Sequence, residues 1–157
     1  MTVYHRDQDI QQVDLRADLI ASLPDLLEPD VIAHLPPSFN VSEQNLVAWI
    51  AERSLEADVF LIKDGVSLNL IGLMFLTRPI NADVHLGYLL GKSAWGKGIA
   101  TELLTGLLEH LSKTNLRLLA GVGVDNPASA HVLEKVGFVK IDQDSDLDTM
   151  MYSITLT

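Results

Sequence analysis

A short segment between one predicted strand and one predicted helix has the composition of a phosphate-binding loop. It reads Trp-Gly-Lys-Gly-Ile-Ala-Thr over residues 95–101. The first N–H groups of a helix lack partners, and the helix dipole adds positive charge at the same end. Small residues there let a pyrophosphate approach the backbone without meeting a Cβ, and a lysine or a hydroxyl strengthens the attraction. The residues that supply these features are Gly96, Lys97, Gly98, Ala100 and Thr101. A glycine pair in such a turn can also be purely structural, and that alternative stays open here.

Two common phosphate-binding motifs fit this segment poorly. The dinucleotide fingerprint G-x-G-x-x-G fails because Thr101 stands where its third glycine belongs. The ATP loop G-x-x-x-x-G-K-[ST] is matched by Gly91, Gly96 and Lys97, but Gly98 replaces the hydroxyl residue that would hold Mg²⁺. A degenerate nucleoside-triphosphate binder is therefore the third functional hypothesis, after the two that the resemblance below implies.

The segment resembles the cofactor loop of the GNAT superfamily of N-acetyltransferases, which reads Q/R-x-x-G-x-G/A. Gly98-Ile99-Ala100 match its last three positions, and Trp95 stands in place of the Gln or Arg. The form Trp-Gly-Lys-Gly-x-Ala-Thr-Glu is similar to the branch that includes ribosomal-protein N-terminal acetyltransferases. Residues 126–138, which begin Asn-Pro-Ala-Ser, resemble the second conserved segment of that branch. The resemblance is strong over residues 84–138 and rests only on strand order elsewhere.

The resemblance implies that acetyl-CoA is the co-substrate and that no metal is needed. The backbone of the strand before the loop would pair with the pantetheine arm like an added strand. The loop would hold the pyrophosphate, and an asparagine after the next strand would bind the pantetheine. The implied cofactor-binding residues are Tyr88, Leu89, Leu90, Trp95, Gly96, Lys97, Gly98, Ile99, Ala100, Thr101 and Asn126. Asn126 also suits a helix N-cap before Pro127, and the two roles are compatible.

The implied chemistry is acyl transfer from a thioester to a neutral amine. The oxyanion of the transition state needs a donor, for which the resemblance implies a backbone N–H near Leu89. Many family members protonate the leaving thiolate with a tyrosine in the second helix, but Leu133 stands at that position. In the Asn-x-x-Ser branch the serine is the substitute, which makes Ser129 the candidate acid. A serine in the first turn of a helix is also often only a cap.

The base that deprotonates the amine is the less defined catalytic group. Family members often place a glutamate two residues before the Gly-Tyr pair of the strand, and His85 stands there. An imidazole can take up a proton near neutral pH. His85 alternates with apolar neighbours, however, so an exposed surface position fits equally well. Water molecules that relay the proton to Asp83 or Asp148 are the alternative.

Hydrophobic periodicity predicts the elements that must position these residues. The pattern predicts two short helices within residues 14–34 and a helix that begins at Ser42 as its N-cap, followed by helices over 98–110 and 127–136. The predicted strands cover 58–63, 68–77, 84–90, 116–124, 139–141 and 150–156. This order predicts an α/β (α+β layered) fold in one domain over residues 1–157. The GNAT-like form is a mixed central sheet of about six to seven strands. It has an antiparallel meander, a splayed parallel central pair and helices on both faces.

Composition excludes several classes of site and partner. The chain has no cysteine, so disulfides, cysteine-ligated zinc and thiol nucleophiles are excluded. His5, His34 and His110 show no metal-ligand spacing. The N-terminus has no signal-peptide pattern, and no run approaches the about 18 apolar residues of a membrane span. We therefore expect a cytoplasmic protein that uses no metal and no membrane.

The acidic balance points to a cationic acceptor. The chain has 11 basic and 21 acidic residues and a net charge of −10, which disfavours nucleic acid and can attract an amine. The acids of the expected acceptor side are Asp25, Glu28, Asp30, Glu43, Asp142, Asp144, Asp146 and Asp148. The first hypothesis is thus acetyl transfer to a small cationic amine or a peptide N-terminus. The alternative is a non-catalytic acyl-CoA sensor of the same fold. Exposed apolar residues near the last strand make a homodimer possible.

Overall fold

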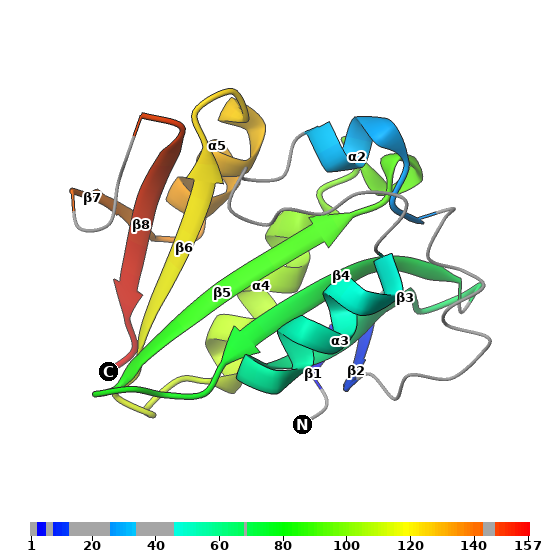
Figure 1. Ribbon diagram of the computed structural model, residues 1–157. Coiled ribbons are helices and arrows are strands. Elements are labelled where there is room, and N and C mark those ends of the chain that lie inside the picture. Colours follow the sequence, from blue (N-terminus) through cyan, green and yellow to red (C-terminus); the bar gives the residue numbers. More distant parts are fainter. Residues whose placement is uncertain (1–2, 6–7, 13–25, 34–45, 68, 143–146) are drawn as a thin grey trace.

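An eight-stranded mixed sheet forms the centre of the molecule in the computed structural model, which describes residues 3–5, 8–12, 26–33, 46–67, 69–142 and 147–157. The strand order is β1-β2-β3-β4-β5-β6-β8-β7 (Figure 1). The strands are β1 (Val3–His5), β2 (Gln8–Gln12), β3 (Ala57–Asp64), β4 (Leu70–Thr77), β5 (Asp83–Leu90), β6 (Arg117–Gly123), β7 (Val139–Ile141) and β8 (Thr149–Thr155). β5 and β6 are parallel, and every other neighbouring pair is antiparallel. The predicted mixed sheet with a parallel central pair is confirmed.

The sheet exceeds the expected six to seven strands because the N-terminal residues form a hairpin. β1 and β2 pair with each other, and β2 then pairs with the edge of β3 from Gln8↔Asp64 to Gln12↔Phe60. The local sequence, Gln-Asp-Ile-Gln-Gln, has a single β-branched residue and no aromatic residue, too few of the residue types that mark a strand. Its strand conformation comes from pairing with β3, which local composition does not report.

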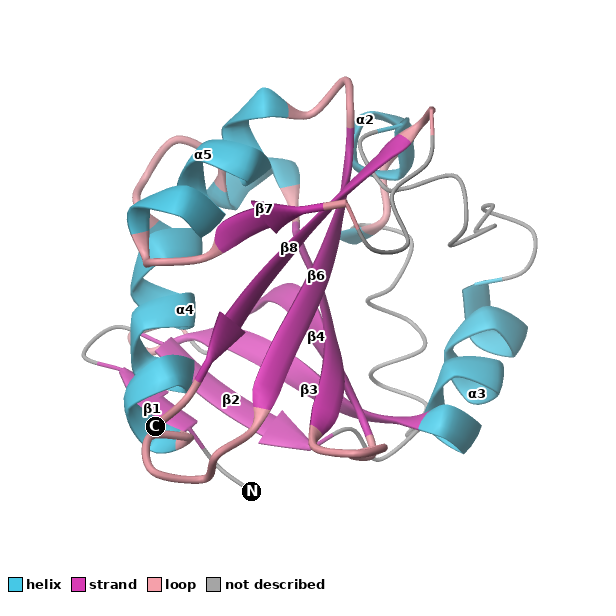
Figure 2. Cartoon of the chain, turned by 90° about the vertical axis from the view of Figure 1, so that its left-hand side faces the viewer, coloured by secondary structure: helices cyan, strands magenta, loops and turns pink. Residues whose placement is uncertain are grey.

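Helices cover both faces of the sheet, as predicted (Figure 2). α4 (Ile99–His110) and α5 (Pro127–Lys135) lie on one face, and α3 (Leu46–Glu56) lies on the other. α4 buries Leu103, Leu104 and Leu107 against the first face, because leucines at this spacing form one apolar stripe. On the second face, Trp49 of α3 packs edge-on against Phe75 of β4, with ring centroids 5.3 Å apart.

The remaining helical segments are short. α2 (Pro29–Ala33) and the 3₁₀ turn η2 (Lys92–Ala94) lie near the end of β5 (Figure 1). The predicted N-cap Ser42 and most of the predicted helical region 14–34 lie outside the described residues. Within the described ranges, no helix is long and apolar enough to cross a membrane.

The parallel strands β5 and β6 part halfway along their length. Their pairing runs from Asp83↔Arg117 to Leu86↔Ala120 and then stops. Beyond that point β5 continues beside β4 as far as Leu90, while β6 continues beside β8 as far as Gly123. The two strands therefore diverge toward their carboxyl ends, which confirms the predicted splay. The carboxyl ends of parallel strands are where α/β sheets place ligands.

Candidate functional site

A cavity of about 730 Å³ opens where β5 and β6 part. Its walls are the unpaired half of β5, the loop that leads to α4, the end of β6 and the first turns of α5. Its volume lies within the usual range for small-molecule sites, about 300–1,000 Å³. Most of the predicted site residues line it: Tyr88, Leu89, Leu90, Trp95, Gly96, Gly98, Ile99, Ala100, Thr101, Asn126 and Ser129. Lys97 and His85 do not.

The glycine loop presents an open backbone to this cavity. Gly98 is the N-cap of α4 with φ 76° and ψ 6°, and Gly96 has φ 69°. Both angles are left-handed, a region that glycine adopts without the penalty other residues meet. A Cβ at either position would meet no atom within 4 Å, so the space in front of the loop is empty. No side chain caps Gly98. The loop therefore suits an anion held by the N–H groups of the first turn of α4.

Trp95 connects the loop to the end of β5. Its indole N–H donates to the Leu90 carbonyl oxygen over 2.9 Å. The backbone N–H of Gly91 in turn donates to the Ile71 carbonyl oxygen over 2.8 Å, which joins the start of the loop to β4. Trp95 stands where related loops have Gln or Arg, and here its side chain fixes the loop by a hydrogen bond to backbone.

Asn126 acts as the N-cap of α5, and Pro127 occupies the first turn. Its side-chain Oδ1 accepts a hydrogen bond from the Ser129 backbone N–H over 3.2 Å. The capping interpretation of Asn126 is thereby confirmed. The same contact places Ser129 at the start of α5, facing the cavity. Leu133, one turn further along α5, also lines the cavity and is otherwise fully buried.

A hydrogen bond that sequence reasoning missed joins the two walls of the cavity. The Tyr88 hydroxyl lies 3.0 Å from Ser129 Oγ, a contact between β5 and α5. Burial raises the pKa of Tyr88, and the hydrogen bond with Ser129 opposes this shift more weakly. The sequence held one signal: Tyr88 has the same strand parity as Leu86 and Leu90, whose side chains pack on the α4 and α5 side.

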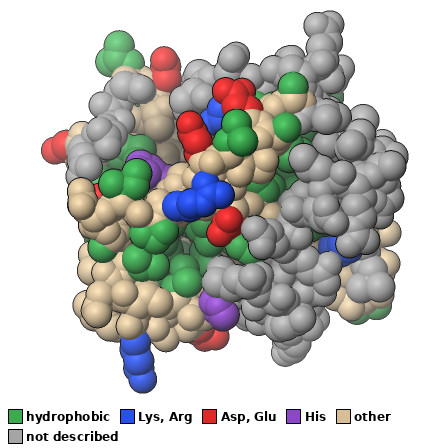
Figure 3. Space-filling model, turned by 60° about the horizontal axis from the view of Figure 1, so that its bottom comes forward, with side chains coloured by type: hydrophobic (Ala, Val, Ile, Leu, Met, Phe, Trp, Pro, Cys, Tyr) green, Lys and Arg blue, Asp and Glu red, His purple; other side chains and the backbone are tan. Residues whose placement is uncertain are grey.

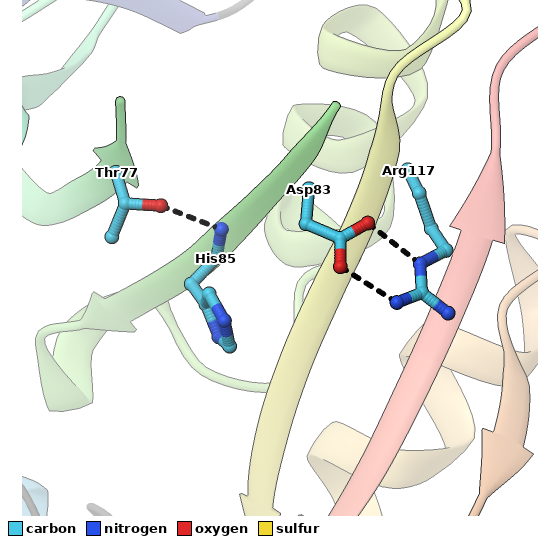
Figure 4. Close-up of polar contacts among 4 residues, drawn as sticks. All are labelled: Thr77, Asp83, His85 and Arg117. Carbon is cyan, nitrogen blue, oxygen red and sulfur yellow. Dashed lines mark hydrogen bonds and ion pairs between the residues drawn. The ribbon is translucent and has the colours of Figure 1, made fainter. Parts of the chain in front are cut away.

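His85 lies at the opposite end of β5 from the glycine loop (Figure 4). Its side chain is exposed, and its backbone N–H donates to Thr77 Oγ1 over 2.8 Å. The strand parity of His85 differs from that of Tyr88, so the two side chains point to opposite faces of the sheet. His85 therefore faces the side of the sheet that α3 covers, outside the cavity lining.

Asp83 is held by an ion pair and is poorly placed to act as a base. Its two carboxylate oxygens accept hydrogen bonds from Arg117 Nε over 2.8 Å and from Arg117 Nη2 over 2.6 Å (Figure 4). These bonds hold the pKa of Asp83 below its ordinary value of 3.8. The pair joins β5 to β6 at the first residue of each strand. It thus fastens the parallel pair at the end opposite to the splay.

On the face drawn in Figure 3, acidic and basic side chains of the described residues are interspersed, and these residues form no basic cluster. Among all the residues that the structure describes, no three His, Cys, Asp or Glu side chains are grouped so as to hold a metal ion.

Four of the predicted acceptor-side acids lie within the described residues and are exposed: Glu28, Asp30, Asp142 and Asp148. Asp30 forms an ion pair with Lys92. The acids at 25, 43, 144 and 146 lie outside the described residues.

Comparison with known proteins yields a family and a consistent fold. Residues 11–139 match the family described as "Acetyltransferase (GNAT) domain". A "probable N-acetyltransferase" of Bacillus subtilis (strain 168) is 27% identical over 88% of this chain and 81% of its own length. The structure of ribosomal-protein-S5-alanine acetyltransferase from Vibrio fischeri matches with a TM-score of 0.72 at 21% identity, covering 99% of this chain and 96% of that one. Spermidine N-acetyltransferase from Vibrio cholerae, in complex with CoA and spermine, matches with a TM-score of 0.72 at 20% identity, covering 95% of each chain.

Proposed function

The chain belongs to the GNAT acetyltransferase family, and on that premise we propose that it transfers the acetyl group of acetyl-CoA to a primary amine. The acceptor is a small cationic amine or the N-terminus of a peptide. The observation that carries the proposal is the cavity between the splayed strands, which has the open glycine loop at its rim. This arrangement offers a groove for an extended chain and an anion site beside it, the two features that an acyl-CoA requires.

The unpaired half of β5 supports binding of the pantetheine arm. Beyond Leu86, residues Tyr88 to Leu90 pair with β4 on one side and face the cavity on the other. A strand edge that has no neighbouring strand can hydrogen-bond an extended ligand in the way that a sheet takes up a further strand. The pyrophosphate would be held by the N–H groups at the start of α4, with Gly96 and Gly98 leaving room for it.

Ser129 is the side chain we assign to the leaving group. Its hydroxyl lines the cavity at the start of α5, where it can donate to the sulfur as the carbon–sulfur bond breaks. The amine must lose a proton to attack. His85 is the candidate base, and the amine would meet it on the α3 face of the sheet. Because His85 lies outside the cavity lining, a chain of water molecules that carries the proton away is the alternative.

The charge of the chain supports a cationic acceptor. The net charge is −10, and a negative surface concentrates amines that are protonated at neutral pH. Asp30 contributes less than the sequence suggested, because Lys92 neutralises it. A neighbour in fold is named as a spermidine N-acetyltransferase, which is compatible with such an acceptor here.

A thiol-release assay over classes of amine tests the proposal. We expect polyamines, aminoglycosides, amino-acid amides or peptides with free N-termini to support release of CoA from acetyl-CoA. The apparent KM should rise with salt, because exposed charges are screened beyond about 10 Å at 0.1 M ionic strength. An anionic best substrate, or a KM that is indifferent to salt, would contradict the proposed cationic acceptor and leave acetyl transfer standing.

A non-catalytic acyl-CoA sensor is the second candidate. Leu133 stands at the position that the family resemblance assigns to a tyrosine acting as general acid, and the candidate base His85 lies outside the cavity lining. Thermal shift by acetyl-CoA without turnover of any amine would favour the sensor. A shift by Mg-ATP alone would contradict both candidates and favour a nucleotide binder.

A further inference from the structure

The contact between Tyr88 and Ser129 lies across the opening of the parallel pair. Tyr88 stands on β5 just beyond Leu86, where pairing with β6 ends, and Ser129 stands in the first turn of α5. Their hydroxyl oxygens are 3.0 Å apart, and either could be the donor. In the described part of the chain, each hydroxyl has the other as its hydrogen-bond partner. Both side chains line the cavity.

A serine hydroxyl has one proton to donate and two lone pairs that accept. If Ser129 donates to Tyr88, the Ser129 proton points at the Tyr88 oxygen and is unavailable to a ligand. If Tyr88 donates to Ser129, the Ser129 proton is free to turn into the cavity. The direction of this single bond therefore decides whether Ser129 can act on a leaving sulfur.

We propose that the Tyr88 hydroxyl donates to Ser129 Oγ and so directs the Ser129 proton into the cavity, which makes Tyr88 a positioning residue for departure of the thiolate. This inference rests on the proposed function. In that step the amine nitrogen forms the new carbon–nitrogen bond and gives up one proton to the base or to water, while the carbon–sulfur bond breaks and the sulfur takes its electron pair. Ser129 donates a hydrogen bond to that sulfur. Ser129 and Tyr88 both keep their protons, and water protonates the released thiolate.

The surroundings of Tyr88 keep it in the donating form. Burial raises the pKa of its phenol, so the hydroxyl stays protonated at the alkaline pH where the amine becomes neutral. A tyrosinate could only accept a hydrogen bond, so Ser129 would then have to donate its proton to Tyr88. The backbone of Ser129 is fixed independently by the Asn126 cap, so the tyrosine needs to orient only the hydroxyl.

Tyr88→Phe removes the hydroxyl and keeps the ring. We expect kcat to fall about tenfold, the effect of one hydrogen bond, with the Kd for acetyl-CoA changed less than about twofold. Ser129→Ala should lower kcat at least as much, and the double variant should lose no more than Ser129→Ala alone, because Tyr88 acts through Ser129. Additive losses in the double variant would overturn the proposal.

Tyr152→Phe is the matched control. Tyr152 is a buried tyrosine on β8 whose hydroxyl donates to Glu134 Oε1 over 3.1 Å, and it does not line the cavity. We expect this variant to retain the wild-type kcat and the wild-type Kd for acetyl-CoA. A fall in kcat equal to that of Tyr88→Phe would show that loss of any buried tyrosine hydroxyl is sufficient, and would overturn the proposal.

A second measurement needs no turnover. The ultraviolet absorbance of the thiolate reports the pKa of the thiol of bound CoA as pH is varied. A donor at the sulfur stabilises the thiolate, so that pKa should be lower on the wild type than on Tyr88→Phe or Ser129→Ala by about one pH unit. An equal thiol pKa on the wild type and Tyr88→Phe would overturn the positioning role. If CoA binds and shows the shift but no amine is acetylated, the transferase proposal fails, whereas the assignment of Tyr88 as the residue that directs the Ser129 proton toward the sulfur stands.

Discussion

Gly98→Glu separates the folding role of the glycine loop from its binding role. Gly98 has a left-handed backbone, which costs a residue with a Cβ about 1–2 kcal/mol. A carboxylate at the start of α4 stabilises the fold by about 0.3–1 kcal/mol through its interaction with the helix dipole. The net loss, about 1 kcal/mol, is small beside the about 5–15 kcal/mol of a typical domain, so the variant should stay folded.

The same carboxylate should exclude the pyrophosphate. A Cβ at Gly98 meets no atom within 4 Å, so the new side chain enters the empty space that we assign to the ligand. Two unit charges about 4 Å apart repel by about 4 kcal/mol at an effective dielectric constant of about 20. Solvent exposure of the loop halves this to about 2 kcal/mol, or about 30-fold in Kd. Steric exclusion adds to that.

Isothermal titration with acetyl-CoA measures the effect, and Gly98→Gln is the matched control. Glutamine has nearly the same size and meets the same backbone penalty, so the ratio of the two Kd values isolates the charge. We expect urea midpoints of the two variants to be close and the Glu variant to bind at least about 30-fold more weakly than the Gln variant. Wild-type affinity in folded Gly98→Glu would refute the assignment of the loop.

Further predictions concern the serine, the ion pair, the metal and the working pH. Ser129→Ala should lower kcat by about 10- to 10³-fold, the cost of losing one hydrogen-bond donor to the charge that develops on the sulfur, with little change in the acetyl-CoA Kd. An unchanged kcat would leave Ser129 as a capping residue. Hydrogen bonds from Arg117 hold the pKa of Asp83 in the folded state below 3.8. The stability that this pair contributes is therefore full above pH 3.8 and is lost as the pH falls through the pKa of the folded state. Urea midpoints of the wild type should fall more steeply below pH 3.8 than those of Asp83→Asn. A chelator should leave the acetyl-CoA Kd unchanged, and loss of binding would show that a metal takes part. Turnover should rise from about pH 7 to about pH 9 as the acceptor amine loses its proton, and a flat profile would argue against free-amine attack.

Local patterns in the sequence predicted the parts of the site that are built from contiguous residues. The glycine loop and α4 follow from small residues between a strand and an apolar helical stripe, and residues 99–110 are helical as expected. The cap and first turn of α5 follow from Asn-Pro at 126–127. The divergence of the parallel strands was an implication of family resemblance, and the pairing register confirms it. These features depend on backbone geometry and short-range hydrogen bonds, which residue types report directly.

Tertiary structure decided the contacts between segments far apart in the chain. Tyr88 and Ser129 are 41 residues apart, and Asp83 and Arg117 are 34 apart. No periodicity encodes such pairs, because they depend on strand register and on how α5 packs against the sheet. The same reason explains the missed N-terminal hairpin, whose strands are stabilised by pairing with β3. Sequence thus determined which backbone segments form the proposed acyl-CoA site. Packing determined which side chains meet across the cavity, since a hydrogen bond forms only where the fold brings donor and acceptor within reach.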